Sequence, residues 1–142
     1  MTFRTLTDSY ATSPQITPAD VPAIVAAGFT RVICNRPDGE NPPDLSAAAM
    51  RQAVEAAGLD FVVNPVIGGA LTMDNVTAQR AAIDSATGPV FAYCASGNRS
   101  SIVWALANAG RMPTDELIAS AARWGYNLEP YRAQIDALAN AG

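Results

Sequence analysis

The chain has 142 residues, a length that suits one domain with a sizeable core. Hydrophobic residues make up 49% and charged residues 15%, which excludes a disordered chain, and the net charge of −4 argues against a nucleic-acid partner. With no histidine and only two cysteines, the chain lacks the residues of Ser-His-Asp or Cys-His catalysis and of common zinc sites. We expect a single domain over residues 1–142 that uses no metal and no cofactor.

No apolar run in the sequence is long enough to span a bilayer, so no membrane association is expected. The first residues, Met1 to Leu6, lack the hydrophobic core of a signal peptide. These two features predict a cytoplasmic protein whose thiols stay reduced.

Strand and helix patterns alternate along the chain. Thr17, Ser46 and Thr72 are suited to cap helices, and Gly28 and Gly58 are suited to end them. In chain order, the expected elements are strands at 3–5 and 10–12, a helix at 17–28, a strand at 29–34, a helix at 46–57, a strand at 59–63, a helix at 73–86, a strand at 90–93, and helices at 99–109, 114–124 and 128–139.

This alternation predicts an α/β fold with a central, mainly parallel sheet flanked by helices. Ligands of such sheets bind beyond the carboxyl ends of the strands. The loops after Cys34, Val63 and Tyr93 are therefore expected to meet at one edge of the sheet and to form the site.

The loop after Tyr93 carries the strongest chemical signal. Small residues after Cys94 allow several backbone N–H groups to converge at a helix N-terminus, which binds anions and favours a thiolate. Arg99 adds a permanent charge whose planar fork fits an oxyanion, so Cys94 and Arg99 are the candidate catalytic residues. The other candidate anion-binding residues of this loop are Ala95, Ser96, Gly97, Asn98 and Ser100. The simpler alternative is a buried structural cysteine, but this combination of residue types favours the functional interpretation.

The loop resembles two known families. Protein tyrosine and dual-specificity phosphatases have five residues between the cysteine and the arginine, whereas rhodanese-type sulfurtransferases have four, as between Cys94 and Arg99. Outside the loop, residues 3–5, 10–16, 32–40 and 88–94 resemble the phosphatase-like domain of β-lactamase-hydrolase-like proteins, a bacterial family named both phosphatase and sulfur transferase. That resemblance implies a protein tyrosine/dual-specificity phosphatase-like topology. Some relatives are fused to a metallo-β-lactamase-fold persulfide oxidoreductase, which implies such a protein as a partner.

Departures from the phosphatase pattern favour sulfur chemistry. Tyr93 stands where phosphatases have histidine, and the loop at 64–71 has no acid to protonate a leaving group. Asp74 is expected in the first turn of a helix, where an acid is simply stabilising, with a role as the catalytic acid as the less favoured alternative. We therefore expect a sulfurtransferase that carries sulfur as a Cys94 persulfide, taken from a small anionic donor such as thiosulfate or a persulfide and passed to a thiol acceptor. The alternatives are a cysteine-dependent phosphatase acting on a phosphate ester through a phosphocysteine, and a catalytically weak anion-binding or interaction module.

Several residues near the expected site have two interpretations. Arg36 is a candidate substrate-binding residue or a loop-bracing arginine, and Asp38 and Glu40 are expected to be solvated or paired with it. Cys34 is expected to be a core thiol, with a resolving thiol for Cys94 as the alternative. The aromatic residues Trp104, Trp124 and Tyr126 are expected at helical positions, as core or pocket wall.

Overall fold

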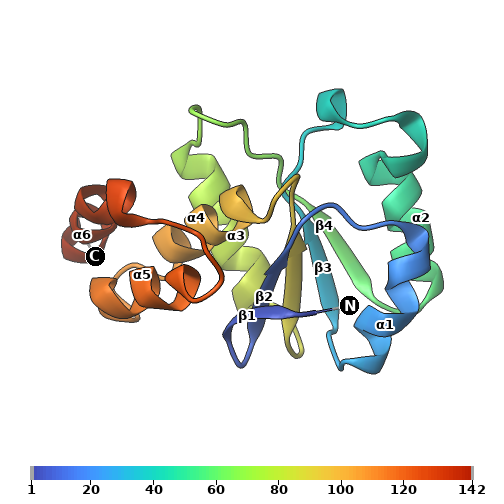
Figure 1. Cartoon of the computed structure of the whole chain (residues 1–142), viewed down its shortest axis with the longest axis horizontal. Coiled ribbons are helices and arrows are strands. Elements are labelled where there is room, and N and C mark those ends of the chain that lie inside the picture. Colours follow the sequence, from blue (N-terminus) through green and yellow to red (C-terminus); the bar gives the residue numbers. More distant parts are fainter. Residues whose placement is uncertain (1, 142) are drawn as a thin grey trace.

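The computed structural model describes residues 2–141, which form a five-stranded sheet with helices on both of its faces (Figure 1). The strands are β1 (Arg4–Thr7), β2 (Tyr10–Ser13), β3 (Arg31–Cys34), β4 (Asp60–Val63) and β5 (Val90–Tyr93). The helices are α1 (Val21–Ala26), α2 (Ala47–Ala56), α3 (Met73–Asp84), α4 (Asn98–Ala107), α5 (Thr114–Ala122) and α6 (Arg132–Ala141).

The strand order is β1-β2-β5-β3-β4, so β5 lies at the centre of the sheet. Four strands run parallel, and β1 pairs with β2 in the antiparallel direction at one edge. Ser13 and Cys34 both pair with Tyr93, the last residue of β5. The carboxyl ends of the parallel strands therefore lie side by side, as the sequence predicted, and Cys94 follows the central one.

Alternate residues of the strands face two separate layers of helices. Val32 and Phe91 pack in the core under α1 and α2, whereas Ile33 and Ala92 pack in the core under α3 to α6. Figure 1 shows α1 and α2 on one side of the sheet and the four later helices on the other. Because β5 is buried on both faces, its four residues are all apolar or aromatic.

The expected elements are all present, with changes at their ends. The hydroxyl of Ser46 accepts a hydrogen bond from the Ala49 N–H at the start of α2, and that of Thr72 accepts one from the Asn75 N–H in α3. The last helix begins at Arg132 rather than at residue 128, because the segment before it forms a separate 3-10 turn, Glu129–Tyr131. Within residues 2–141, none of the helices has the length and apolar character needed to cross a membrane.

Candidate active site

Cys94 lies at the carboxyl end of β5, directly before a loop that leads into α4. Its side chain is fully buried, and its sulfur accepts a hydrogen bond of 3.1 Å from the N–H of Gly97. Gly97 has a φ of 94°, a backbone conformation that is open to glycine and strained for other residues. The turn at Gly97 thus aims one backbone N–H at the sulfur and starts α4 beside it.

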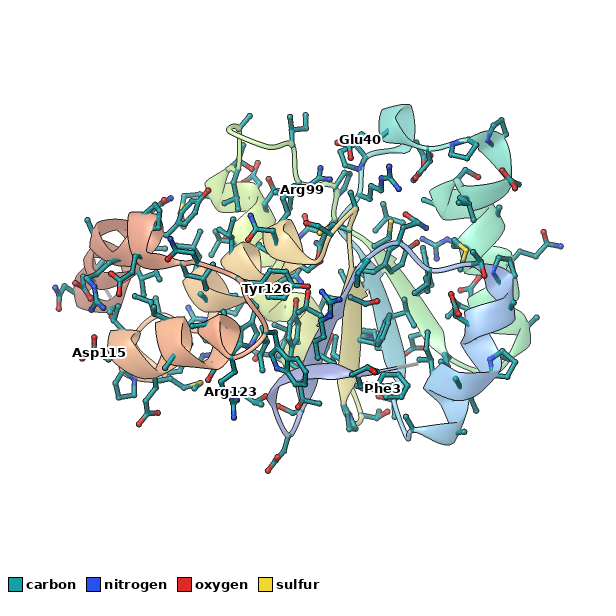
Figure 2. All side chains as sticks on the ribbon, in the orientation of Figure 1. Phe3, Glu40, Arg99, Asp115, Arg123 and Tyr126 are labelled. Carbon is teal, nitrogen blue, oxygen red and sulfur yellow. The ribbon has the colours of Figure 1, made fainter. Side chains whose placement is uncertain are left out.

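Arg99 is held by a carboxylate from the loop after β3. Its two terminal nitrogens donate to the two oxygens of Glu40 at 2.7 and 2.8 Å, and one of them also donates to the carbonyl oxygen of Val66 at 2.8 Å. Figure 2 shows Arg99 and Glu40 facing each other near the end of β5. The three predicted loops therefore do meet, through this arginine.

Arg36 joins the same cluster from the loop that carries Glu40. Its guanidinium donates to the Glu40 carboxylate at 3.4 Å, to the Glu40 carbonyl oxygen at 3.0 Å and to the side-chain oxygen of Gln15 at 3.2 Å. The Glu40 carboxylate thus lies between two guanidinium groups. The sequence predicted a pairing with Arg36 but not the one with Arg99. Asp38, by contrast, accepts a hydrogen bond from the Ala47 N–H at the start of α2 and does not pair with Arg36.

The charges of this cluster stabilise one another. Arg99 holds the pKa of Glu40 below its ordinary range, mainly through its hydrogen bonds and also through its charge. Arg36 adds a smaller effect in the same direction. The bond to Glu40 likewise raises the pKa of Arg99, with a smaller contribution from Cys94. At neutral pH the Glu40 carboxylate is therefore ionised, and it is a poor proton donor.

A closed ring of buried polar side chains supports the start of α4. The hydroxyl of Ser100 donates to Asn35 at 2.9 Å, Asn35 donates to Gln79 at 2.9 Å, Gln79 donates to Tyr10 at 3.0 Å, and Tyr10 donates back to the carbonyl oxygen of Ser100 at 2.8 Å. The hydroxyl of Ser100, which the sequence placed among the candidate anion-binding groups, thus donates its proton to Asn35. Sequence reasoning missed this ring, although a glutamine at a core position of α3 is its signal.

The remaining loop residues divide by exposure. Ala95, Ser96 and Asn98 are exposed, and the Asn98 N–H donates to the Ser96 hydroxyl at 3.2 Å. Tyr126, which follows α5 in a non-helical segment rather than in a helix, donates its hydroxyl proton to the carbonyl oxygen of Ser96 at 2.8 Å. Nothing in its sequence context pointed to this contact with the loop.

The other candidates lie where the sequence placed them. Asp74 is exposed in the first turn of α3. Cys34 is buried under α1 and α2, its sulfur lies 3.5 Å from the carbonyl oxygen of Arg36, and burial raises the pKa of its thiol. This environment favours the core role of Cys34, and its alternative role as a resolving thiol stays a prediction.

Comparison with known proteins identifies the family. Residues 2–111 match the family model described as "Beta-lactamase hydrolase-like protein, phosphatase-like domain". The chain belongs to this family. A beta-lactamase hydrolase-like protein of Agrobacterium fabrum is 34% identical over 112 residues, which are 78% of this chain and 26% of that protein. The chain thus spans about a quarter of the length of this curated relative.

Solved structures agree with the family assignment. A candidate phosphatase from Neisseria meningitidis is 38% identical, covers 94% of this chain and 96% of its own, and superposes with a TM-score of 0.80. A candidate phosphatase from Shewanella putrefaciens is 21% identical, with 98% and 91% covered and a TM-score of 0.76, and shows the fold alone.

These comparisons confirm the α/β, protein tyrosine/dual-specificity phosphatase-like fold and a phosphatase-like domain. They favour the phosphatase alternative over the sulfurtransferase that we expected first. Cys94, Arg99 and the loop between them stay candidate site residues.

Proposed function

We propose that this protein hydrolyses phosphate monoesters through a covalent phosphocysteine on Cys94. The observation that carries the proposal is the position of the Cys94 sulfur, which lies at the end of the central strand, under the Gly97 N–H and at the N-terminus of α4. Backbone N–H groups at a helix N-terminus stabilise both a thiolate and the phosphate that it attacks. The match to a phosphatase-like family supports the same chemistry. We place the protein in the cytoplasm, where the thiol stays reduced.

The reaction has two steps. The Cys94 thiolate attacks phosphorus, a sulfur–phosphorus bond forms, and the bond from phosphorus to the ester oxygen breaks with both electrons going to that oxygen. Water then attacks the phosphocysteine, inorganic phosphate leaves, and the thiolate is restored. Loop N–H groups and Arg99, once it turns from Glu40 toward the substrate, would bind the phosphoryl oxygens.

The absence of an acid on the loop at 64–71 limits the substrates. Glu40 is ionised between two guanidinium groups and Asp74 is exposed on α3, so neither is placed to protonate the leaving oxygen. An oxygen that leaves as a stable anion needs no such acid. We therefore propose aryl phosphates as the substrate class, with alkyl phosphates turning over far more slowly.

Sulfur transfer is the second candidate, favoured by the same lack of an acid and by the four-residue spacing between Cys94 and Arg99. The thiolate would attack the outer sulfur of thiosulfate, and sulfite would leave as an anion without needing a proton. The acceptor thiolate would then take that sulfur and release the Cys94 thiolate. A metallo-β-lactamase-fold persulfide oxidoreductase as a partner belongs to this candidate.

The first test compares the native protein with Cys94→Ser. We expect the native protein to release phosphate from a series of aryl phosphates, with rates that fall steeply as the leaving phenol becomes less acidic, and Cys94→Ser to lose this activity. Asp74→Asn serves as the matched charge control and should leave the rates unchanged. Intact-mass spectrometry after mixing with thiosulfate tests the second candidate.

Each outcome separates the candidates. Cys94-dependent phosphate release without a sulfur adduct supports the phosphatase. The sulfurtransferase replaces the phosphatase if three results are found together. The protein gains the mass of one sulfur atom, this sulfur is removed by a thiol and absent in Cys94→Ser, and no phosphate is released. If neither phosphate release nor a sulfur adduct is observed, an anion-binding module becomes the best account. A loss of turnover in Asp74→Asn would contradict the acid-free mechanism.

A further inference from the structure

The peptide unit between Ser96 and Gly97 is engaged on both of its sides. Its N–H donates to the Cys94 sulfur at 3.1 Å, and its carbonyl oxygen accepts the hydroxyl proton of Tyr126 at 2.8 Å. A peptide unit is planar, with the N–H and the C=O on opposite sides. Whatever holds the carbonyl oxygen outward therefore also aims the N–H inward at the sulfur.

The hydroxyl of Tyr126 is itself polarised by a cation. A terminal nitrogen of Arg4 on β1 donates to the tyrosine oxygen at 2.6 Å, and the Arg4 guanidinium carbon lies 5.8 Å from the centroid of the tyrosine ring. Tyr126 is buried, so water competes little for its hydroxyl. A hydroxyl that accepts a bond from a cation is a stronger donor to its own acceptor, because successive hydrogen bonds polarise one another.

The fit between Tyr126 and the loop is close. A Cβ atom on Gly97 would collide with the Tyr126 hydroxyl, so the tyrosine occupies the space that the missing side chain leaves. The neighbouring carbonyl oxygens are also held by hydrogen bonds: that of Gly97 accepts from the Thr12 hydroxyl at 2.8 Å, and that of Ala95 accepts from the Gln15 N–H at 3.3 Å. Of these supports, Tyr126 alone acts on the peptide unit whose N–H reaches Cys94.

We propose that Tyr126 is a positioning residue that, backed by Arg4, polarises the Ser96–Gly97 peptide and thereby stabilises the Cys94 thiolate. The inference rests on the proposed function in that the thiolate is taken as the nucleophile. It assigns this role to a residue outside the region that the family model matches, since Tyr126 lies beyond residue 111. Figure 2 shows Tyr126 between the C-terminal helices and the sheet, where it reaches toward the loop.

The test follows the ionisation of Cys94 and needs no substrate. Thiolate absorbs in the ultraviolet, so the difference in absorbance between a protein and the same protein with Cys94→Ser, measured from acidic to alkaline pH, reports this one thiol. Tyr126→Phe removes the hydroxyl, and with it the hydrogen bonds to Ser96 and Arg4, but keeps the ring. We expect its ionisation midpoint to rise by about 0.5 pH unit, which is about threefold less thiolate at pH values below the midpoint.

Two further variants make the result specific. Trp124→Phe is the matched control, because Trp124 donates to the Thr5 carbonyl oxygen on β1 at 2.8 Å and, within residues 2–141, makes no hydrogen bond to the loop. Its midpoint should stay at the native value. Arg4→Gln keeps the tyrosine and its bond to Ser96 but removes the cation, so it should raise the ionisation midpoint of Cys94 by a smaller amount. If Tyr126→Phe does not fold, Arg4→Gln tests the role of Tyr126 in its place.

An unchanged midpoint in Tyr126→Phe, or an equal rise in Trp124→Phe, would overturn the assignment. Turnover of aryl phosphates by the native protein is measured separately. A raised midpoint without turnover supports the role of Tyr126 and contradicts the phosphatase, whereas turnover with an unchanged midpoint contradicts only the role of Tyr126.

Discussion

At the scale of single residues, the most consequential contact is between Arg99 and Glu40. The carboxylate occupies both terminal nitrogens of the guanidinium, the same two donors that would grip an oxyanion. An anion that enters the loop must therefore either displace Glu40 or share Arg99 with it. We therefore expect the loop to bind strongly charged anions in preference to weakly charged ones, which cannot compete with a carboxylate held at this distance.

Replacing Glu40 with glutamine should strengthen anion binding. Loss of one negative charge about 6 Å from a bound anion is worth roughly 1 kcal/mol, or about fivefold in affinity. Sulfate, whose charge is constant from neutral to mildly acidic pH, is a suitable probe for calorimetric titration. Glu55→Gln, which removes a carboxylate from an exposed pair with Arg51 on α2, is the matched control and should bind sulfate as the native protein does.

The pH dependence of this difference has a definite sign. Arg99 holds the pKa of Glu40 below its ordinary range, so the carboxylate stays charged as the pH falls and is neutralised only at a lower pH than an ordinary glutamate. The native protein and Glu40→Gln should therefore differ in sulfate affinity at neutral pH and converge in acid. Weaker binding by Glu40→Gln at neutral pH would mean instead that Glu40 chiefly holds Arg99 in position.

At the scale of elements, the polar ring joins four segments that the sequence keeps far apart. Tyr10 belongs to β2, Asn35 follows β3, Gln79 is in α3 and Ser100 is in α4, and all four side chains are buried. In such a ring the buried groups are hydrogen-bonded to one another, which offsets the cost of removing them from water. The ring fixes the start of α4 against the sheet and thereby fixes the loop before it.

Removing the amide of Gln79 should destabilise the protein strongly. Gln79→Leu keeps a side chain of similar size but removes the hydrogen bonds of Gln79 to Asn35, Asn64 and Tyr10, and the loss of a partner by a buried polar group costs about 1–3 kcal/mol. We expect a loss of roughly 2–5 kcal/mol in the free energy of unfolding, measured by urea denaturation. Gln52→Leu on the exposed face of α2 is the control, with an expected change within about 0.5 kcal/mol. A loss of the same small size in both variants would show that the ring contributes little.

Local patterns predicted the elements better than they predicted the contacts of the site. The strand Val90 to Tyr93 and the caps at Ser46 and Thr72 could be placed because apolar runs and hydroxyl caps act within a few residues. The candidate loop was also visible, since its residue types lie next to one another. Glu40 and Tyr126 were not assigned to the loop, because their contacts with it depend on how distant segments pack.

At the scale of the whole molecule, the helices beyond residue 111 complete the core. The family model ends there, yet the buried side chains under α5 and α6 belong to the same cluster as those of the sheet. The fully or nearly fully buried aliphatic ones are Leu117, Ile118, Leu128 and Ile135. The C-terminal segment is therefore part of the folding unit, which supports the prediction of a single domain over residues 1–142.

A chain that ends at residue 111 should not fold on its own. Each buried leucine or isoleucine contributes about 1.5–3 kcal/mol, so loss of these four removes roughly 6–12 kcal/mol. That is comparable with the entire stability of an ordinary domain, about 5–15 kcal/mol. We expect the truncated chain to show no cooperative thermal transition by circular dichroism. A sharp transition near that of the full chain would contradict this prediction.

The central place of β5 also has a consequence for how the protein is made. Its neighbours β2 and β3 are both synthesised earlier, and the closing helices α5 and α6 are synthesised later. Sheets with such distant pairings fold slowly, because the chain must close long loops before the strands can pair. While the ribosome has released the chain only as far as α4, the segment that carries Tyr126 is not yet available to contact the loop. Under our proposal for Tyr126, the Cys94 thiolate is stabilised only after this segment has emerged.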